Sequence, residues 1–345
     1  MAHIDIAPVT QWITEASVAH GEQLPAHLMQ RLSISRRGAG HVLRKLVHLQ
    51  WLTGTGATRE KGYRPGAMRQ VVRRYPLHGL QEDLPWRVDF APCFDLPAQV
   101  HRMAQHAFTE LLNNAIDHSG GQQVTVSMRQ TPQQVQLLIS DDGCGLFKRI
   151  EDTFEVSDPQ LAMLELSKGK LTSAPDQHCG RGLYFTSRLA DVLDVHANHA
   201  AFQRRAWDAQ RWHEARAMPR SGTSVYMAIA LDTQRTLDEV MRATSLAEGG
   251  YGFDTTHVPL SLISEGAALA SRAEARRAAS RLAQFRRAEL DFTGIADIGH
   301  GFADELFRVF SRANPGVELV PLGMNAQVAA MVACVRGEST RGAAG

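Results

Sequence analysis

Apolar residues recur at helical spacing through the first part of the chain. Residues 9–19, 26–32 and 37–51 each place apolar side chains three and four positions apart, which puts them on one face of a helix. A turn rich in Gly and Thr and then a short basic stretch follow at residues 53–64. We therefore expect a mostly helical first domain over residues 1–80.

Helical and strand spacing then alternate over residues 81–235, after a connector at 81–95. We expect helices at 97–118 and 182–190, strands at 123–129, 135–140, 192–196 and 223–230, and a long irregular segment at 147–179. A helix, two neighbouring strands and a later helix and strands are the order of an α/β domain with mixed strand directions.

The alternation continues over residues 236–345. The pattern predicts strands at 258–263, 288–291 and 317–321, and helices at 265–285, 302–311 and 326–335. A segment of about 100 residues with this order fits a small α/β sandwich. The chain as a whole is therefore expected to be a multidomain α/β protein with domains at 1–80, 81–235 and 236–345.

Composition limits the classes of protein that remain. The chain has 345 residues, of which 44% are apolar, so each domain has enough apolar side chains for a core. No apolar run approaches the length of a membrane-spanning helix, and the N-terminus lacks the basic start and apolar run of a signal peptide. The four cysteines are scattered and form no CxxC pair. We expect a cytoplasmic protein with reduced thiols and no membrane partner.

Charge is unevenly distributed along the chain. Residues 1–80 hold eleven Lys and Arg against four Asp and Glu, whereas the remaining residues hold 26 against 32. A basic excess confined to one domain favours a polyanionic partner for that domain. A solvated basic face has the same composition, so the charge has to be combined with the fold.

The helix expected at 97–118 carries the first candidate site. Glu110 and Asn114 are four residues apart and share one helical face, with Asp117 and His118 on the next turn. Mg²⁺ prefers oxygen ligands and keeps several water molecules, so one Asn oxygen with phosphate oxygens is enough to hold it. A Glu can orient or deprotonate a water or a hydroxyl. Polar residues at this spacing also form solvated faces.

Three turns that contain glycine supply the other candidates. The strand at 135–140 runs into Asp141, and Gly143 and Gly145 follow. A carboxylate at a strand end can accept a hydrogen bond from the exocyclic amine of adenine, and glycines allow close approach of the backbone. The second turn opens a helix whose free N–H groups suit phosphate, and the third leads into a strand. The candidates in these two turns are Gly180, Arg181, Gly182, Leu183 and Thr223.

In this order and spacing the four motifs resemble the Bergerat, or GHKL, ATP-binding fold of gyrase B, histidine kinases and anti-sigma-factor kinases, over about 130 residues. The resemblance implies that the domain binds ATP and Mg²⁺. By the same likeness, Glu110 is the catalytic Glu, Asn114 the Mg²⁺ ligand and Asp141 the residue that reads adenine. It places Gly143 and Gly145 under the base and Thr223 near it, and it assigns Gly180, Arg181 and Gly182 to the phosphates.

The resemblance also makes the segment 147–179 the ATP lid. Within it, Lys168 or Lys170 would reach the γ-phosphate, although both side chains suit solvent equally well. Histidine kinases usually carry Asn where this chain has Glu110, and no dimerising helix with a phosphoacceptor histidine precedes the domain. The pattern ExxxNAxxH, from Glu110 to His118, looks more like the anti-sigma serine kinases.

The N-terminal domain resembles a winged helix-turn-helix. Ser35 precedes the third expected helix and would cap it, and that helix would be the recognition helix. The residues expected to face DNA are Ser35, Arg36, Arg37, His41, Arg44 and Lys45 on this helix, and Arg59, Lys61 and Arg64 on the wing. Lys and Arg supply phosphate affinity and some base contacts. Winged helices also serve as protein-docking or dimer modules.

The C-terminal domain looks STAS-like, the type found in anti-anti-sigma factors. The loop that normally carries a phosphorylated Ser is here residues 296–302, which contain no hydroxyl side chain. This departure makes a phosphate switch at that loop doubtful and favours a surface that binds a regulatory protein.

Together these features predict a cytoplasmic ATP- and Mg²⁺-binding regulator, with slow hydrolysis, that controls DNA binding or a protein partner in transcription. The alternative is an anti-sigma-type serine/threonine kinase that acts on a separate protein. A histidine kinase or an inactive ATP site fits less well, because Glu110, Asn114 and Asp141 are all present. The sequence leaves open whether the chain forms a homodimer.

Overall fold

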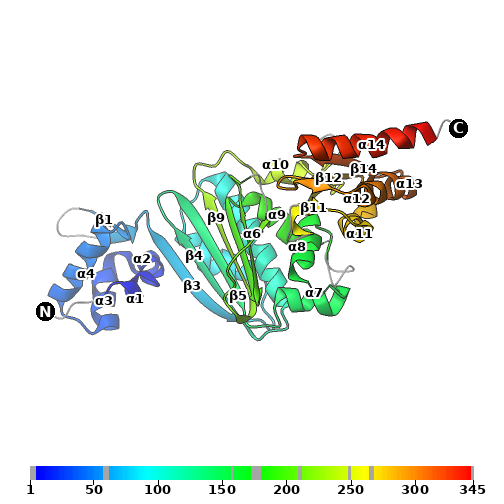
Figure 1. Ribbon diagram of the computed structural model, residues 1–345. Helices are drawn as coiled ribbons and strands as arrows, with labels where there is room; N and C mark the ends of the chain where they lie inside the picture. The colour runs from blue at the N-terminus through cyan, green and yellow to red at the C-terminus, as the bar shows by residue number, and fades with distance from the viewer. Residues whose placement is uncertain are drawn as a thin grey trace. The chain divides into compact units, whose positions relative to one another are not determined.

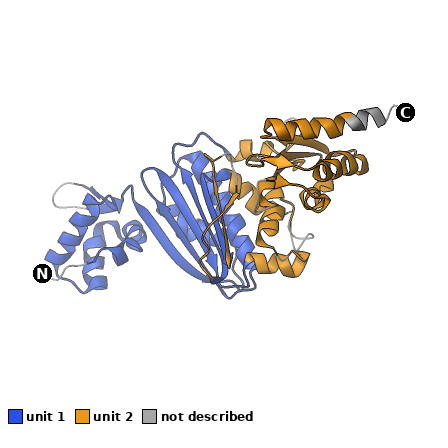
Figure 2. Cartoon of the chain, in the orientation of Figure 1, with its two compact units in different colours: residues 1–145, 189–197, 220–236 blue, residues 146–188, 198–219, 237–345 orange. Residues whose placement is uncertain are grey.

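A computed structural model describes residues 5–56, 62–156, 158–171, 180–208, 212–247, 250–263 and 268–342. The chain forms two compact units (Figure 2). Unit 1 comprises residues 1–145, 189–197 and 220–236, and unit 2 comprises residues 146–188, 198–219 and 237–345. None of the described helices is long and apolar enough to cross a membrane.

The N-terminal part of unit 1 is helical and ends in an antiparallel hairpin. Buried side chains such as Ile13, Leu24, Leu28 and Leu46 form its core. The elements are α1 (Ala7–Thr10), α2 (Ile13–His20), η1 (Gly21–Gln23), α3 (Leu24–Leu32), α4 (Arg36–His48), β1 (Leu52–Thr55) and β2 (Gly62–Pro65). A group of short helices followed by a hairpin is compatible with the expected winged helix-turn-helix, which stays a prediction.

Helix α4 begins where the sequence indicated. The hydroxyl of Ser35 accepts a hydrogen bond of 3.2 Å from the backbone N–H of Gly38. A capping hydroxyl satisfies one of the N–H groups that a helix start leaves unpaired. The predicted cap is therefore confirmed.

The central sheet of unit 1 has the strand order β3-β4-β5-β9-β6. Strands β3, β4, β5 and β9 pair antiparallel. Short helical turns precede α6, which lies across the face of β5 and β9 (Figure 1). The elements are β3 (Arg69–Pro76), α5 (Asp83–Pro85), η2 (Trp86–Phe90), η3 (Ala91–Cys93), α6 (Ala98–His118), β4 (Gln123–Gln130), β5 (Gln134–Asp141), β6 (Val192–Asn198) and β9 (Arg220–Ala230).

The core of this layer follows from two periodicities. Alternate residues of β5, Val135, Leu137 and Ile139, are buried, as expected when one face of a sheet is covered. Helix α6 presents a buried stripe toward that face, which includes Phe108 and Leu112. The polar side of α6 is thereby left for the candidate site residues.

Residues 69–76 differ from the sequence expectation, which counted them in the first domain. They form β3 and pair with β4 along their whole length, from Arg69 opposite Gln130 to Pro76 opposite Gln123. Only Val71 of this strand is fully buried. A strand at the edge of a sheet needs few apolar side chains, so its pattern resembled a basic surface rather than a strand.

Unit 2 contains a three-stranded parallel sheet with the order β10-β12-β14. Its elements are α7 (Leu146–Phe154), α8 (Pro159–Lys168), α9 (Gly182–Leu189), β7 (Ala200–Arg205), β8 (Trp212–Glu214), α10 (Leu237–Arg242), β10 (Thr255–Pro259), η4 (Leu260–Leu262), β11 (Ala268–Leu269), α11 (Arg272–Ala279), η5 (Leu282–Gln284), β12 (Arg287–Asp291), β13 (Asp297–Ile298), α12 (His300–Asp304), η6 (Glu305–Phe310), α13 (Ser311–Ala313), β14 (Glu318–Leu322) and α14 (Ala326–Gly342).

The lid segment was expected to be irregular over residues 147–179, but the part that the structure describes is largely helical. Its described part contains helices α7 and α8. Asp158 caps α8 by accepting a hydrogen bond of 2.8 Å from the N–H of Gln160, Pro159 occupies its first turn and Gly169 follows its end. These are ordinary helix start and stop signals, and the sequence analysis overlooked them because each helix is short.

The helix expected at 265–285 is also shorter in the structure. Helix α11 covers Arg272–Ala279, and Ser271 with Glu274 forms a capping box at its start. Ser280 takes a non-helical backbone conformation after it. Residues 264–267 lie outside the described part of the chain. Helix α11 and the turn that follows it belong to the C-terminal block, defined here as residues 236–345.

Candidate nucleotide site

Helix α6 positions the first pair of candidate residues in unit 1. Leu111, Leu112 and Ala115 point into the core, so the other side of the helix carries the polar groups. Asn114 is exposed and Glu110, one turn earlier, is half-buried. The carboxylate of Glu110 can bind a water or a hydroxyl. The amide oxygen of Asn114 can bind a hydrated Mg²⁺.

Asp117 and His118 occupy the last turn of α6. Asp117 is exposed and His118 is half-buried. Both residues stay predicted nucleotide contacts. Among the described residues there is no cluster of three or more His, Cys, Asp or Glu side chains able to hold a metal by itself. A Mg²⁺ held by Asn114 would therefore take its remaining ligands from phosphates and water.

Asp141 ends strand β5, and only 6% of its surface is exposed. Its Oδ1 accepts hydrogen bonds from the backbone N–H groups of Gly143, at 2.9 Å, and Thr223, at 3.1 Å. Burial raises the pKa of Asp141 above its ordinary value, while these two hydrogen bonds and Arg220 oppose the rise. The structure thus brings together Asp141, Gly143 and Thr223, which the sequence placed in two separate motifs.

Gly222 allows the backbone of β9 to lie this close to Asp141. Its φ is +76°, and a Cβ on it would lie 2.1 Å from the carbonyl oxygen of Asp141. Any side chain there would push strand β9 away from Asp141. Gly222 was absent from the predicted site residues, although the sequence Arg-Ser-Gly-Thr before a strand was a usable signal.

Arg220 is a second residue that the sequence analysis did not assign to the site. Its guanidinium donates to Oγ of Ser140 at 2.7 Å and to the carbonyl oxygen of Asp141 at 3.1 Å, and it also contacts Oγ of Ser224. These contacts fasten β9 to the end of β5. Arg220 therefore helps to hold the strand end that carries Asp141.

The turn after Asp141 is tied to the end of α6. The N–H of Cys144 donates to the carbonyl oxygen of Ser119 at 2.9 Å, and the Ser119 hydroxyl donates to the carbonyl oxygen of Ala115 at 2.6 Å. Gly145 is buried in the same turn, with φ of +89°. This connection fixes the helix that carries Glu110 and Asn114 relative to the turn that carries Asp141.

The predicted phosphate loop lies in unit 2. Gly180 precedes helix α9, Gly182 and Leu183 are its first residues, and Arg181 stands between the two glycines. The first N–H groups of a helix have no partner within it and are favourable to phosphate. All four residues stay predicted nucleotide contacts, and Cys179 lies outside the described residues.

The two candidate lysines of the lid segment are both engaged within unit 2. Lys168 is fully buried, and its ammonium donates to Glu165 and to the carbonyl oxygens of Arg277 and Ser280. Lys170 donates to the carbonyl oxygen of Gln284 at 2.7 Å. All three N–H groups of Lys168 therefore have acceptors. A contact between Lys168 and a phosphate stays a prediction, and it would require α8 to move from the position described here.

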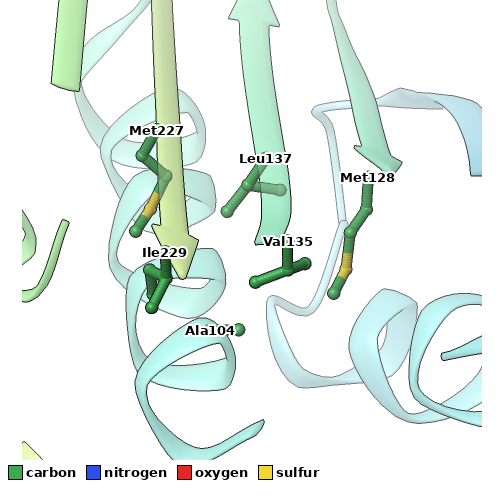
Figure 3. A pocket seen from close by; sticks show the side chains of 6 residues that line it. All are labelled: Ala104, Met128, Val135, Leu137, Met227 and Ile229. Carbon is green, nitrogen blue, oxygen red and sulfur yellow. The ribbon is translucent and has the colours of Figure 1, made fainter. Parts of the chain in front are cut away.

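Six apolar side chains line a small pocket between α6 and the central sheet (Figure 3). They are Ala104, Met128, Val135, Leu137, Met227 and Ile229. A nucleotide needs donors and acceptors for its base and phosphates, and none of these six side chains supplies them. The pocket therefore belongs to the core.

The N-terminal block, defined here as helices α1 to α4 with strands β1 and β2, presents a basic helix surface. On α4, Arg36, Arg37, His41 and Arg44 are exposed and Lys45 is half-buried. Arg64 on β2 is exposed as well. Arg59 and Lys61 lie outside the described residues. DNA contact by Ser35, Lys45 and their neighbours on this surface stays a prediction.

Comparison with known families agrees with two of the three expected domains. Residues 85–203 match the family described as Histidine kinase-like ATPase domain. Residues 276–329 match the family described as STAS-like domain of unknown function (DUF4325). A search of curated proteins finds no match to the chain. The predicted GHKL-type ATPase domain and the predicted C-terminal STAS-like domain are therefore confirmed, and a nucleotide-binding, regulatory role is indicated.

Proposed function

We propose that the protein is a regulator in which ATP and Mg²⁺ bind the GHKL-type domain and thereby control DNA binding by the N-terminal block. The observation that carries the ATP part is the buried Asp141 carboxylate, held through Oδ1 by Gly143 and Thr223. Its other oxygen is the atom that we assign to the adenine amine. A buried carboxylate oxygen without a second donor favours a hydrogen bond from an exocyclic amine, since burial makes an unmet acceptor costly.

Mg²⁺ would be held by Asn114, with phosphates and water completing the shell. The amide lies on the exposed side of α6, where a hydrated ion fits. When bound, the metal neutralises charge on the phosphates. Glu110 would orient or deprotonate the attacking water, and the half-buried position of its carboxylate favours that role over a purely solvated one.

The DNA part rests on charge and on a connection inside unit 1. Glu15 of α2 lies 3.0 Å from the guanidinium of Arg73 on β3, and Arg73 also lies 3.8 Å from Asp89. Tyr75 donates to Asp89 at 2.7 Å. The Glu15–Arg73 pair joins the helical N-terminal part to β3, the first strand of the sheet, and Asp89 of η2 holds Arg73 and Tyr75 of that strand. A change of nucleotide state thus has a physical route to the basic helix α4.

A band-shift titration with mixed genomic DNA fragments tests the proposal. We expect retardation that changes when ATP and Mg²⁺ are added, and no such change with ATP and excess chelator. Absence of DNA binding in every nucleotide state would reject the DNA part, while calorimetric titration with ATP would still report the nucleotide site on its own.

A second candidate function is a serine/threonine kinase that acts on another protein. The position of Glu110 one turn before Asn114 favours it, because phosphoryl transfer to a hydroxyl uses a base beside the metal-bound phosphate. Incubation of the protein with γ-labelled ATP and a cell extract distinguishes the two functions. Label on a protein supports the kinase, and free phosphate without labelled protein supports ATP hydrolysis alone.

A further inference from the structure

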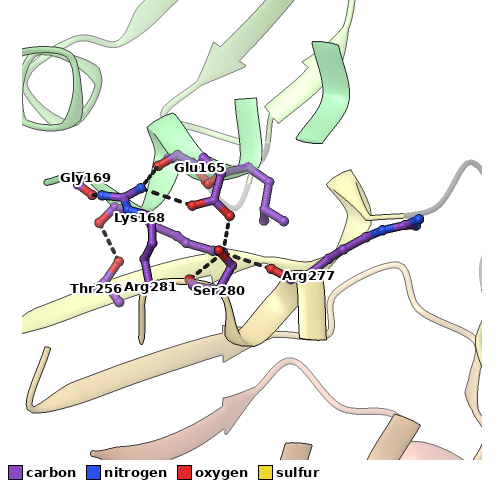
Figure 4. Close-up of polar contacts among 9 residues, drawn as sticks. Glu165, Lys168, Gly169, Thr256, Arg277, Ser280 and Arg281 are labelled. Carbon is purple, nitrogen blue, oxygen red and sulfur yellow. Dashed lines mark hydrogen bonds and ion pairs between the residues drawn. The ribbon is translucent and has the colours of Figure 1, made fainter. Parts of the chain in front are cut away.

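Helix α8 of the lid segment ends on a cradle of acceptors in the C-terminal block (Figure 4). Lys168 has no exposed surface. Its ammonium donates to Glu165 at 2.7 Å, and to the carbonyl oxygens of Arg277 and Ser280 at 3.0 Å each. The two carbonyls belong to the end of α11 and the residue that follows it, so part of the STAS-like match receives this cation.

The backbone on either side of the Lys168 side chain is held as well. The hydroxyl of Thr256, on β10, donates to the carbonyl oxygen of Lys168 at 2.7 Å. Arg281 donates to the carbonyl oxygen of Gly169 at 2.9 Å and to Oε2 of Glu165 at 3.0 Å. Four residues of the C-terminal block therefore hold the end of α8, and each of these hydrogen bonds is buried or partly buried. They are Thr256, Arg277, Ser280 and Arg281.

Gly169 shows that the fit is steric as well as polar. Its φ is +74°, and a Cβ on it would lie 2.5 Å from the ring of Phe253. Phe253 is buried, and its ring centre lies 4.5 Å from that of Tyr184 on α9. Only glycine allows the backbone to pass so close to this ring. Both lid-side helices, α8 and α9, therefore pack on Phe253.

Two further cations of this region meet the same surface. Lys170 donates to the carbonyl oxygen of Gln284 and lies 4.3 Å from the ring centre of Phe285. Arg181 lies 5.6 Å from the ring centre of Phe253. Aromatic faces and carbonyl oxygens are both favourable to cations. Lys168, Lys170 and Arg181 are also the cations that the sequence assigned to the nucleotide phosphates.

The cluster around Lys168 is a weak source of net stability. Two cations, Lys168 and Arg281, share one carboxylate, Glu165, inside the protein. Burial lowers the pKa of Lys168, and the neighbouring Glu165 carboxylate only partly opposes this. Removing charges from water costs about as much free energy as such contacts return. A ligand with several negative charges is therefore able to compete for these cations.

We propose that the C-terminal STAS-like block and the phosphates of ATP compete for the same lid cations, so that the bonds of Lys168 and Lys170 to this block keep these cations from the phosphates. This inference rests on the proposed ATP site and adds the regulation of that site. Release of Lys168 and Lys170 from the cradle accompanies ATP binding, and the nucleotide state is thereby transmitted to the C-terminal block.

Hydrogen–deuterium exchange on the full chain tests the competition. Arg281→Met removes the bonds to Glu165 and Gly169 but leaves every lid cation in place, and Thr256→Val is a milder variant of the same surface. Arg276→Met is the matched control, because Arg276 pairs with Glu305 and lies on α11. Exchange in residues 158–171 is followed without nucleotide, with ADP and Mg²⁺, and with ATP and Mg²⁺.

We expect ATP to increase exchange in residues 158–171 of the parent protein more than ADP does. Without nucleotide, Arg281→Met and Thr256→Val should already exchange faster, and their apparent ATP affinity should rise about tenfold because less docked lid has to be displaced. Arg276→Met should behave as the parent. Normal ATP binding with unchanged exchange in both variants would overturn the competition, whereas no ATP binding by the parent would reject the proposed function itself.

Discussion

The backbone N–H of Thr223 lies 3.1 Å from Oδ1 of Asp141, although 82 residues separate the two along the chain. Gly143, two residues after Asp141, donates to the same oxygen. The carboxylate is thus oriented by backbone groups from the turn after β5 and from β9, which leaves its second oxygen for the ligand in our proposal. This arrangement makes Asp141 the most direct test of ATP binding.

Asp141→Asn should lower ATP affinity about tenfold or more. The Asn oxygen can still accept from Gly143 and Thr223, but its amide would face the adenine amine with a donor, and hydrogen bonds to charged groups contribute about 1.5–3 kcal/mol. Calorimetric titration measures the change. Asp142→Asn is the control, because Asp142 accepts from Gln122 and Gln123 outside the assigned adenine contact. Equal affinity in Asp141→Asn and the parent would contradict the adenine assignment.

The same substitution should stabilise the nucleotide-free protein at pH 7. Burial raises the pKa of Asp141, so the folded protein holds this proton more tightly than the unfolded chain does. Ionised Asp141 therefore costs stability at neutral pH, and the cost decreases as the pH falls toward the raised pKa. Thermal unfolding at pH 7 and pH 5 should show a smaller difference between Asp141→Asn and the parent at pH 5. A difference that grows on acidification would show that the sign is wrong.

Two substitutions on α6 should separate binding from turnover. Asn114→Ala should abolish the Mg²⁺-dependent part of ATP binding, because the proposed protein ligand is lost. Glu110→Gln should retain ATP binding but reduce phosphate release about 100-fold, within the range for loss of a general base. Titration with and without Mg²⁺ and a phosphate-release assay give the two readouts. Unchanged Mg²⁺ dependence in Asn114→Ala would remove the metal assignment.

Arg37→Ala and Arg44→Ala should each weaken DNA binding at all sequences. Both side chains are exposed on α4, and removal of one phosphate contact should reduce the slope of log affinity against log salt by about 0.9. Fluorescence anisotropy at several salt concentrations measures this slope. Arg312→Ala, an exposed arginine of α13 in the C-terminal block, serves as control. The same loss in Arg312→Ala would mean that the effect comes from overall charge.

Arg73→Met should uncouple DNA binding from ATP. This change removes the contacts of Arg73 with Glu15 and Asp89, and it leaves the half-buried Glu15 without that partner. ATP affinity should stay at the parent value while the ATP-dependent change in DNA retardation disappears. Arg87→Met removes only the exposed pair with Asp83 and should leave the response intact. A full ATP response in Arg73→Met would exclude this route.

Motifs that are local in sequence could be identified without the structure. Ser35 before an apolar-periodic stretch indicated the cap of α4, and the structure confirms it. Glu110 and Asn114 one turn apart and Asp141 at a strand end indicated a GHKL-type site, and the family match over residues 85–203 agrees. The helix cap and the shared helical face follow from periodicity, which involves only neighbours along the chain, and the kind of ATP-binding domain was implied by the resemblance of the four motifs to a known family.

Contacts between distant segments were decided by tertiary structure alone. The sequence could not place Arg220 and Gly222 against Asp141, because that requires β9 to pair beside β5. Nor could it assign the edge strand β3. Val71 is the one fully buried residue of this strand, so the sequence shows no alternation of apolar and polar side chains there. Pairing between strands adds information that no local window contains.

Lys168 shows the difference most clearly. As a sequence feature it was a lysine near a Gly in a polar segment, equally suited to solvent and to phosphate. The folded chain buries it against carbonyl oxygens of Arg277 and Ser280, more than a hundred residues away. The sequence by itself determined the cap of α4 and most elements of the central domain, because these depend on local spacing, and its resemblance to a known family indicated the kind of ATP-binding domain. Only the tertiary structure decided which partners the buried charges find, because desolvation and pairing depend on what surrounds a residue in space.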